Sequence, residues 1–237
     1  MVETLSGFGQ WTHITGAGDG AVLFVDTNNG GGATAVIDSA GHYRMVETLS
    51  GFGRWTHIVS ANKDAVLFVD ANNGGGATAV IDSAGHYRMV ETLSGFGQWT
   101  HITGAANGAV LFVDANNGGG ATAVIDSAGH YRMVETLSGF GRWTHIVSAN
   151  RDAVLFVDAN NGGGATAVID AAGHYEMVET LSGFGKWTHI TGTPDGAVLF
   201  VDVNNGGGAT AVIDSAGHYR MVETLSGFGK WTHIAGV

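Results

Sequence analysis

Two short segments of this sequence, "DTNNGGG" and "SGFGQW", combine polar and aromatic residues of the kinds that bind small polar ligands. Planar amide and carboxylate groups can bond pairs of sugar hydroxyls, glycine exposes backbone N–H groups, and an aromatic face packs against the C–H groups of a sugar ring. The two segments therefore predict a sugar site. Its candidate residues in the first copy are Asp26, Asn28, Asn29, Gly30, Phe8 and Trp11.

Both segments recur every 44 residues. An enzyme usually needs one asymmetric set of catalytic groups, whereas these candidates are repeated along the chain, and unique residues such as Pro194 and Glu176 assemble no catalytic set. Weak sites that are repeated gain avidity on a multivalent surface, so we expect a binding protein with about five equivalent sites and not an enzyme. The repeated candidates are Asn72, Asn73, Trp55, Asn116, Asn117, Trp99, Asn160, Asn161, Trp143, Asn204, Asn205 and Trp187.

The same residues also have a purely structural interpretation. Asn-Gly is a strong hairpin signal, Asx side chains cap turns without any ligand, and a large aromatic residue at every repeat boundary commonly serves packing. Asp26-x-Asn28-x-Gly30 looks like the opening of a calcium loop, but the later bidentate Glu is missing, so we expect no metal site and no cofactor. A second function class therefore stays open: a symmetric scaffold, designed or recently amplified, with no ligand of its own.

A histidine, His13 in the first copy, also recurs in every repeat. Side chains alternate along a strand, so His13 and Trp11 share one face. If that face lined a central channel, the histidines could hold an anion or a metal. The interpretation that we favour is a half-buried histidine that is hydrogen-bonded between repeats, while His42 and Tyr43 begin an outer strand.

The elements that position these residues are short strands. Apolar runs are bounded by Gly, Asn, Asp and Ser clusters at spacings of about 8 to 12 residues, and no segment shows a helical period. The first repeat predicts strands at residues 11–15, 21–26, 32–38 and 42–49. Short turns between consecutive strands make them antiparallel neighbours, so each unit is a four-stranded meander in an all-β chain.

One meander cannot cover both of its faces, so the units must pack on one another. Four strands in about 40 to 45 residues are typical of a propeller blade, whereas the alternative, an open β-solenoid, would need polar caps that this chain lacks. We therefore predict a single five-bladed β-propeller domain of 44-residue blades. Its repeats are 1–44, 45–88, 89–132, 133–176 and 177–220, followed by a partial repeat, 221–237.

The two ends of the chain are rival copies of one stretch, residues 1–17 and 221–237. An outer-type strand at residues 2–6 and an inner-type strand at 231–234 exceed the twenty strands that five such blades need. Our hypothesis is that one copy completes the last blade while the other is displaced. The protein is then a monomer, with a dimer through the spare strand as the alternative.

The meander also determines on which rim of the blade each turn lies. The "NNGGG" turn and the "SGFG" link emerge on one rim, and the first turn and the "DSAGH" turn emerge on the other. "NNGGG" and "SGFG" do not vary between repeats, whereas the first turn reads "GAGDG", "SANKD", "GAANG", "SANRD" and "GTPDG". The rim of invariant segments is therefore the predicted binding face.

Composition limits the partners. The chain has 237 residues, of which 44% are apolar and 13% charged, so a folded, soluble protein with a sizeable core is expected. A net charge of -11 disfavours nucleic acid and anionic lipid surfaces as partners. There is no cysteine, no apolar run long enough to span a membrane and no recognisable signal peptide in "MVETLSGFGQW", so the localisation stays open.

The repeat, with "G-x-W" before its first strand, "LF-V" in its second and "SGFG" after its last, resembles the blades of tachylectin-type five-bladed propeller lectins. In that family too, a glycine-rich stretch with Trp separates the blades, and the chain ends on an inner strand, as "GKWTHIAGV" does here. The resemblance implies a lectin whose partners are glycans or glycoconjugates and whose sugars are N-acetylated hexosamines. WD40 repeats share the length, but no Trp-Asp dipeptide occurs in this sequence.

Overall fold

The computed structural model describes residues 8–235 and shows a chain built from strands and short turns. In these residues the only helical element is a 3-10 turn, η1 (Gly18–Gly20). The strands of the first and second sheets are β1 (His13–Gly16), β2 (Ala21–Asp26), β3 (Gly31–Ile37), β4 (Tyr43–Ser50), β5 (His57–Ala61), β6 (Ala65–Asp70), β7 (Gly75–Ile81) and β8 (Tyr87–Ser94). Those of the third and fourth are β9 (His101–Gly104), β10 (Ala109–Asp114), β11 (Gly119–Ile125), β12 (Tyr131–Ser138), β13 (His145–Ala149), β14 (Ala153–Asp158), β15 (Gly163–Ile169) and β16 (Tyr175–Ser182). The fifth sheet consists of β17 (His189–Gly192), β18 (Ala197–Asp202), β19 (Gly207–Ile213) and β20 (Tyr219–Ser226).

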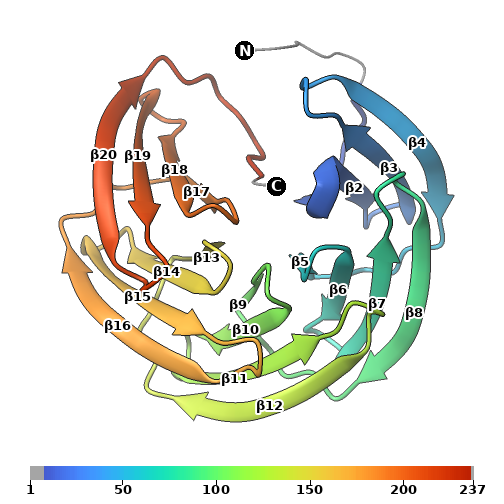
Figure 1. Cartoon of the computed structure of the whole chain (residues 1–237), viewed down its shortest axis with the longest axis horizontal. Coiled ribbons are helices and arrows are strands. Elements are labelled where there is room, and N and C mark those ends of the chain that lie inside the picture. Colours follow the sequence, from blue (N-terminus) through green and yellow to red (C-terminus); the bar gives the residue numbers. More distant parts are fainter. Residues whose placement is uncertain (1–7, 236–237) are drawn as a thin grey trace. The chain divides into compact units, whose positions relative to one another are not determined.

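Each sheet is a meander of four consecutive antiparallel strands, and the sheets are the five blades of a β-propeller (Figure 1). This confirms the predicted fold class. The strand bounds agree with the prediction to within two residues, the largest shift being at β1, which begins at His13 and not at Trp11. Within the described residues, no helix has the length and apolar character that spanning a membrane requires.

The chain divides into two compact units. Among the described residues, the first unit covers 8–98 and 125–131 and therefore holds the blades β1–β4 and β5–β8. The second covers 99–124 and 132–235 and holds the blades β13–β16 and β17–β20 with most of the third blade.

The second strand of each blade is apolar on both faces, and in the first four blades both faces are buried, whereas in β18 Ala197 is exposed and Leu199 only partly buried. In the first unit, alternate residues of β2 such as Leu23 and Val25 pack with Val66 and Phe68 of β6. Phe24, on the other face of β2, packs with residues of its own blade and with Trp11. Burial of each large apolar side chain contributes about 1.5–3 kcal/mol, so the contact between blades is the main source of stability within the unit.

The second unit repeats this packing. Leu111 and Val113 of β10 pack with Val154 and Phe156 of β14, and Leu155 of β14 packs with Phe200 of β18. The same apolar positions thus meet at each of these junctions.

A β-bulge interrupts the last strand of the blade. Thr34 pairs with Glu47 and Ala35 with Met45, so Val46 is the extra residue. Equivalent bulges occur in the second, fourth and fifth blades. The bulge places Tyr43 and Met45 on one face of the sheet and Glu47 and Leu49 on the other, which simple alternation would not do.

The two rival end copies have different outcomes. Residues 221–226 belong to β20 and complete the last blade, whereas residues 1–7, with the predicted strand 2–6, lie outside the described residues. The strand predicted at 231–234 is not formed. His189 Nε2 donates to the carbonyl oxygen of Thr232 at 3.3 Å, but no β-ladder is described for that segment, and Trp231 is 53% exposed.

Candidate functional site

Two side chains of the "DTNNGGG" turn, those of Asp26 and Asn29, form hydrogen bonds within the turn itself. Asp26 Oδ1 accepts the backbone N–H of Asn28 at 3.0 Å, and Asn29 Oδ1 accepts that of Gly31 at 2.7 Å. The backbone N–H of Gly30 donates to the carbonyl oxygen of Asp26 at 2.8 Å. Asp26 is nearly buried, while Asn28 and Asn29 are exposed. The Asp and the second Asn therefore act as turn caps in the first copy.

The other four copies have the same two side-chain bonds, at 2.7–3.0 Å. Sugar binding by these residues stays a prediction, because the amide N–H groups of the exposed Asn side chains are not used in these bonds. The side-chain oxygen of the second Asn, however, already accepts a backbone N–H in every copy.

The turn and the link to the next repeat do meet on one rim. The backbone N–H of Phe52 donates to the carbonyl oxygen of Gly30 at 3.1 Å. Gly30 has φ +75°, and a Cβ added there would lie 2.9 Å from the carbonyl oxygen of Phe52. A Cβ at Gly32 would overlap the Phe52 ring. The turn thus meets Phe52, the repeat of Phe8 in the following link.

An aromatic cluster lies where this link enters the second blade. The Phe52 ring centroid lies 5.8 Å from that of Phe68 and 5.6 Å from that of Tyr87. Trp55 packs on the other side of Phe68, at 5.6 Å. These distances are typical of tilted and edge-on aromatic contacts, which stabilise beyond their buried area by about 0.5–1.5 kcal/mol each.

The cluster borders a cavity of about 160 Å³ between the first two blades. Two of its walls, Phe52 and Trp55, come from the predicted site segment. Ser50, at the end of β4, pairs with Gly31 at the start of β3 and so brings the cavity close to the Asn turn. The complete lining is Leu49, Ser50, Gly51, Phe52, Trp55, Phe68, Ala77, Tyr87 and Met89.

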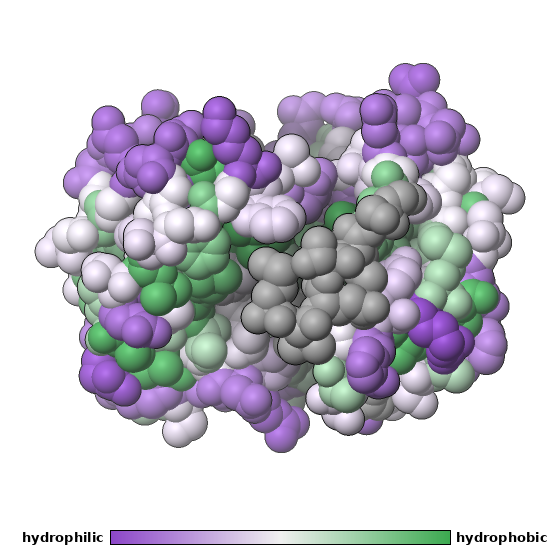
Figure 2. All heavy atoms as spheres, turned by 90° about the horizontal axis from the view of Figure 1, so that it is seen from above, coloured by the Kyte–Doolittle hydropathy of each residue, from purple (hydrophilic) through white to green (hydrophobic). Residues whose placement is uncertain are grey.

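The cavity is apolar but carries two free polar groups. No described residue accepts a hydrogen bond from the indole N–H of Trp55 or from the hydroxyl of Tyr87, although both side chains are partly buried. Burial raises the pKa of Tyr87 to about 12, so its hydroxyl stays protonated and can donate at neutral pH. Met89 is 51% exposed at the opening, and patches of apolar residues reach the surface among hydrophilic ones elsewhere on the protein (Figure 2).

The same side chains cluster at two junctions of the second unit. Phe140 lies 6.0 Å from Phe156 and 5.5 Å from Tyr175, with Trp143 5.5 Å from Phe156. At the next junction, the corresponding residues are Phe184, Phe200, Tyr219 and Trp187, at 6.0, 5.3 and 5.5 Å.

Sequence reasoning missed the residues of the last strand that line the cavity. Tyr87 and Met89 stand two positions apart and therefore share a face of β8. Their recurrence every 44 residues, with an apolar Met at a solvent-exposed position, was the available signal. The sequence interpretation placed Tyr43, the counterpart of Tyr87, only at the start of a strand.

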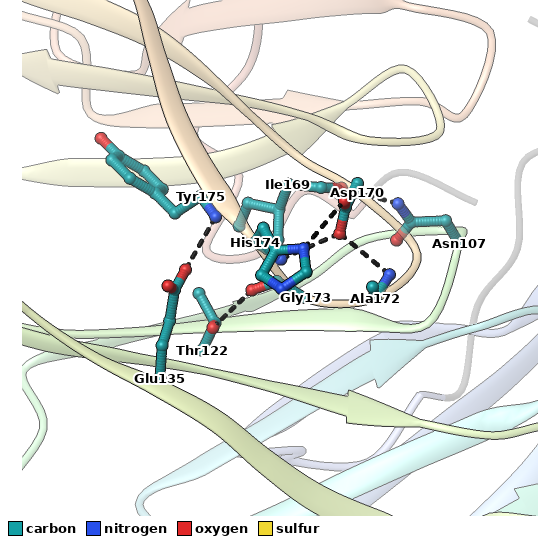
Figure 3. A network of polar contacts seen from close by, with 9 residues as sticks. All are labelled: Asn107, Thr122, Glu135, Ile169, Asp170, Ala172, Gly173, His174 and Tyr175. Atoms are coloured by element: carbon teal, nitrogen blue, oxygen red, sulfur yellow. Dashed lines mark hydrogen bonds and ion pairs between the residues drawn. The ribbon is translucent and has the colours of Figure 1, made fainter.

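The opposite rim holds a polar network that joins neighbouring blades (Figure 3). Glu135 of β12 accepts the backbone N–H of Tyr175 at 2.8 Å, and Thr122 of β11 donates to the carbonyl oxygen of Gly173 at 2.6 Å. Asn107 Nδ2 donates to the carbonyl oxygen of Ile169 at 2.7 Å. Side chains of the third blade thus hold a turn of the fourth.

That turn is organised by Asp170. Its Oδ1 accepts the backbone N–H groups of Ala172 and His174 at 2.9 Å each, and its Oδ2 lies 3.1 Å from His174 Nδ1. The backbone N–H of His174 lowers the pKa of the Asp170 carboxyl. Both side chains are exposed, and among the described residues no group of three or more His, Asp or Glu side chains could hold a metal ion. We assign these Asp–His pairs to turn structure.

The recurring histidine lies between blades. His145 Nε2 donates to the carbonyl oxygen of Thr188 in the next blade at 3.4 Å, and its Nδ1 lies 2.9 Å from Thr144 Oγ1. His101 makes the same contact with the carbonyl oxygen of Thr144 at 3.3 Å. Burial lowers the pKa of both histidines. The favoured interpretation, a half-buried histidine hydrogen-bonded between repeats, is confirmed at these junctions.

No protein-family model matches the chain, and a search of curated proteins finds no relative. Solved structures are similar in fold. A functionally unknown protein from Desulfotomaculum acetoxidans has a TM-score of 0.67 at 9% identity, covering 94% of this chain and 72% of that protein. A candidate 6-phosphogluconolactonase from Bacteroides uniformis has a TM-score of 0.61 at 13% identity, covering 94% and 74%.

The periplasmic gluconolactonase PpgL of Pseudomonas aeruginosa has a TM-score of 0.53 at 11% identity, covering 96% of this chain and 88% of that enzyme. These lactonase names contradict the prediction that the chain is not an enzyme. Repetition was a poor ground for that prediction because this fold also carries enzymes, so a propeller architecture does not exclude catalysis. At 9 to 13% identity, the likeness shows the fold alone, and the chain is a β-propeller of repeated blades.

Proposed function

We propose that the chain is a multivalent carbohydrate-binding protein in which the aromatic cluster between consecutive blades receives one face of a sugar. The observation that carries this proposal is the cavity with Trp55 and Tyr87 in its wall. It offers aromatic faces for the C–H groups of a sugar ring and two polar hydrogens without a partner among the described residues.

The size and the rim of the cavity favour a small polar ligand. Its volume of about 160 Å³ is below the roughly 300–1,000 Å³ of sites for drug-sized ligands, and it suits a single small ring. The exposed Asn28 and Asn29 lie in the turn beside the Gly31–Ser50 pair, so their amide groups can bond hydroxyls that project from the cavity. N-acetylated hexosamines are the proposed class, because the acetamido group offers both a methyl group for the apolar wall and polar atoms for the indole and phenol groups.

Repetition of a weak site along one chain raises the overall avidity for a multivalent surface. A shallow site with a dissociation constant near 1 mM corresponds to only about 4 kcal/mol, but linked sites that engage one surface together can raise the overall avidity by about 10²–10⁴. The same aromatic residues recur at several junctions, so each added repeat adds a site of the same kind.

The test is calorimetric titration of the full chain with N-acetylglucosamine, together with a triple variant, W55F/W143F/W187F. Phe keeps an aromatic face but lacks the indole N–H, and loss of one hydrogen bond weakens binding roughly threefold to tenfold at those sites. The matched control is W231F, because Trp231 is exposed and has no described blade after it.

We expect binding of several sugars per chain, weakened in the triple variant and unchanged in W231F. No heat of binding at millimolar sugar would reject the proposal and favour the scaffold without a ligand. Equal affinity in the triple variant would also reject it, since the junction cavities would then not be the sites.

A further inference from the structure

One position varies within the otherwise invariant link between repeats. The segment "SGFG" is followed by a variable residue and then by the invariant Trp. Every variant at this position is polar, and a cation occurs in four of the six copies. The residues are Gln10, Arg54, Gln98, Arg142, Lys186 and Lys230.

Three of these cations stand next to the aromatic clusters described above. Arg54, Arg142 and Lys186 directly precede Trp55, Trp143 and Trp187. A Cβ added at Gly53 would lie 3.4 Å from the Trp55 ring, so the indole lies against the backbone beside Arg54. The same approach is seen at Gly141 and Gly185, both at 3.4 Å.

These cations have no hydrogen-bond or ion-pair partner among residues 8–235. Arg54, Arg142 and Lys186 are exposed, and none forms an ion pair or a side-chain hydrogen bond with a described residue. The cavity beside Arg54 is lined by no carboxylate. The nearest carboxylate at Tyr87, that of Glu47, is engaged with the Tyr87 backbone N–H at 3.0 Å. In a chain with a net charge of -11 and only 10 Lys and Arg residues, three unpaired cations at equivalent sites are a considerable share.

We propose that Arg54, Arg142 and Lys186 make their sites selective for acidic sugars, those that carry a sulfate or carboxylate group beside the ring. This inference rests on the proposed function, because the aromatic cluster must first hold the sugar ring. The flexible cation then reaches over the Trp edge to the anionic substituent. Copies with Gln at this position lack that attraction, so one chain combines sites of two specificities.

The experiment compares N-acetylglucosamine with N-acetylglucosamine 6-sulfate, which differ in the anionic group, by calorimetric titration at low salt. The test variant is R54Q/R142Q/K186Q, which installs the residue found naturally at Gln10 and Gln98. The control variant is K63Q/R151Q, which removes two positive charges from the first turn of the second and fourth blades. Lys63 and Arg151 lie in turns of the opposite rim, and neither is adjacent in sequence to a residue that lines the cavity.

We expect the sulfated sugar to bind about twofold to fivefold more tightly than the neutral one, the range for an exposed ion pair, and salt to reduce the difference. The test variant should lose this preference and keep its affinity for the neutral sugar, while the control variant keeps both. If both sugars bind the unmodified chain equally, or if the test variant keeps the preference, the inference is wrong although the sugar site stands. If neither sugar binds, the proposed function itself is wrong.

Discussion

Gly164 is the position where the packing of the aromatic cluster can be tested most directly. It is the last glycine of one "NNGGG" turn, and its backbone does not require a positive φ. A Cβ added there would overlap the ring of Phe184 and lie 3.0 Å from the carbonyl oxygen of Phe156. We therefore expect Gly164→Ala to displace Phe184 from its contacts with Phe200 and Tyr219, whose ring centroids lie 6.0 and 5.3 Å away.

The expected change in the free energy of unfolding is the difference between two opposed effects. Overpacking in a well-packed region destabilises by about 1–3 kcal/mol. Replacing glycine by alanine in a compatible backbone stabilises by about 0.4–1 kcal/mol, because the unfolded chain has less freedom to lose. The net loss is roughly 0.5–2 kcal/mol, which lowers the melting temperature of a chain of this size by roughly 1–8 °C.

Thermal unfolding and urea unfolding of four chains test this prediction: unmodified, G164A, F184L and the double variant. Leu lacks the ring atoms that the new methyl group meets. The loss of unfolding free energy caused by G164A should therefore be about 1 kcal/mol smaller in the F184L background. Gly139→Ala is the control. Gly139 has φ +91° and open space where an added Cβ would stand, so its cost should be the same with and without F184L. An unchanged cost of G164A in the F184L background would refute the reasoning.

Two further predictions concern the contacts between blades. Burial lowers the pKa of His101 and His145 below the ordinary value of 6.5, so the unfolded state binds more protons near that pH. Their contribution to stability is complete above pH 6.5 and is lost as the pH falls below it. Urea midpoints measured from pH 8 to pH 5 should therefore fall less steeply in H101Q/H145Q than in the unmodified chain. Asn107 donates to the carbonyl oxygen of Ile169 and accepts the backbone N–H of Ala109; Asn107→Ala should lower the free energy of unfolding by about 1–3 kcal/mol in urea, and Asn107→Asp should lower it at least as much, because a carboxylate oxygen would then face the Ile169 carbonyl oxygen.

The sequence was sufficient to predict the fold because its signals are local and repeated. Strands such as β2 (Ala21–Asp26) are bounded by Gly, Asn and Asp turns, and short turns leave consecutive strands only antiparallel neighbours. The bulge at Val46 was not predictable. Its backbone register depends on how Val46 and Glu47 meet the next blade, where a Cβ on Gly85 would approach Val46 and where Glu47 bonds Tyr87. Those contacts exist only after blades pack, and no pattern within one repeat encodes them.

The sequence predicted only some of the residues that line the candidate cavity, Phe52 and Trp55 among them. The Asn turn and the link meet on one rim as predicted, because a meander fixes which turns emerge together, as the bond between Phe52 and Gly30 shows. Binding at this rim stays a prediction. The sequence could not tell a turn-capping residue from a ligand-binding one. Asn29 suits either role, and in the structure its side-chain oxygen accepts the backbone N–H of Gly31. Tyr87 and Met89 were missed because they come from the far end of the repeat and reach the cavity only through the pairing of β8 with β7.

The variable residue before each Trp differs from its neighbours in how far packing constrains it. A Cβ on Gly53 would make ordinary contact with the Trp55 indole, whereas a Cβ on Gly32 would overlap the Phe52 ring, so a substitution at Gly32 disturbs the packing of this junction. Arg54 is exposed and forms no hydrogen bond or ion pair with a described residue. Had the copies simply drifted, any exposed residue would serve at this position; instead it holds Gln, Arg or Lys in all six copies, each a long side chain that donates hydrogen bonds. Under the proposed function, these donors would stand beside the acceptor oxygens of a ligand at the edge of the indole, and the titration of R54Q/R142Q/K186Q tests that role.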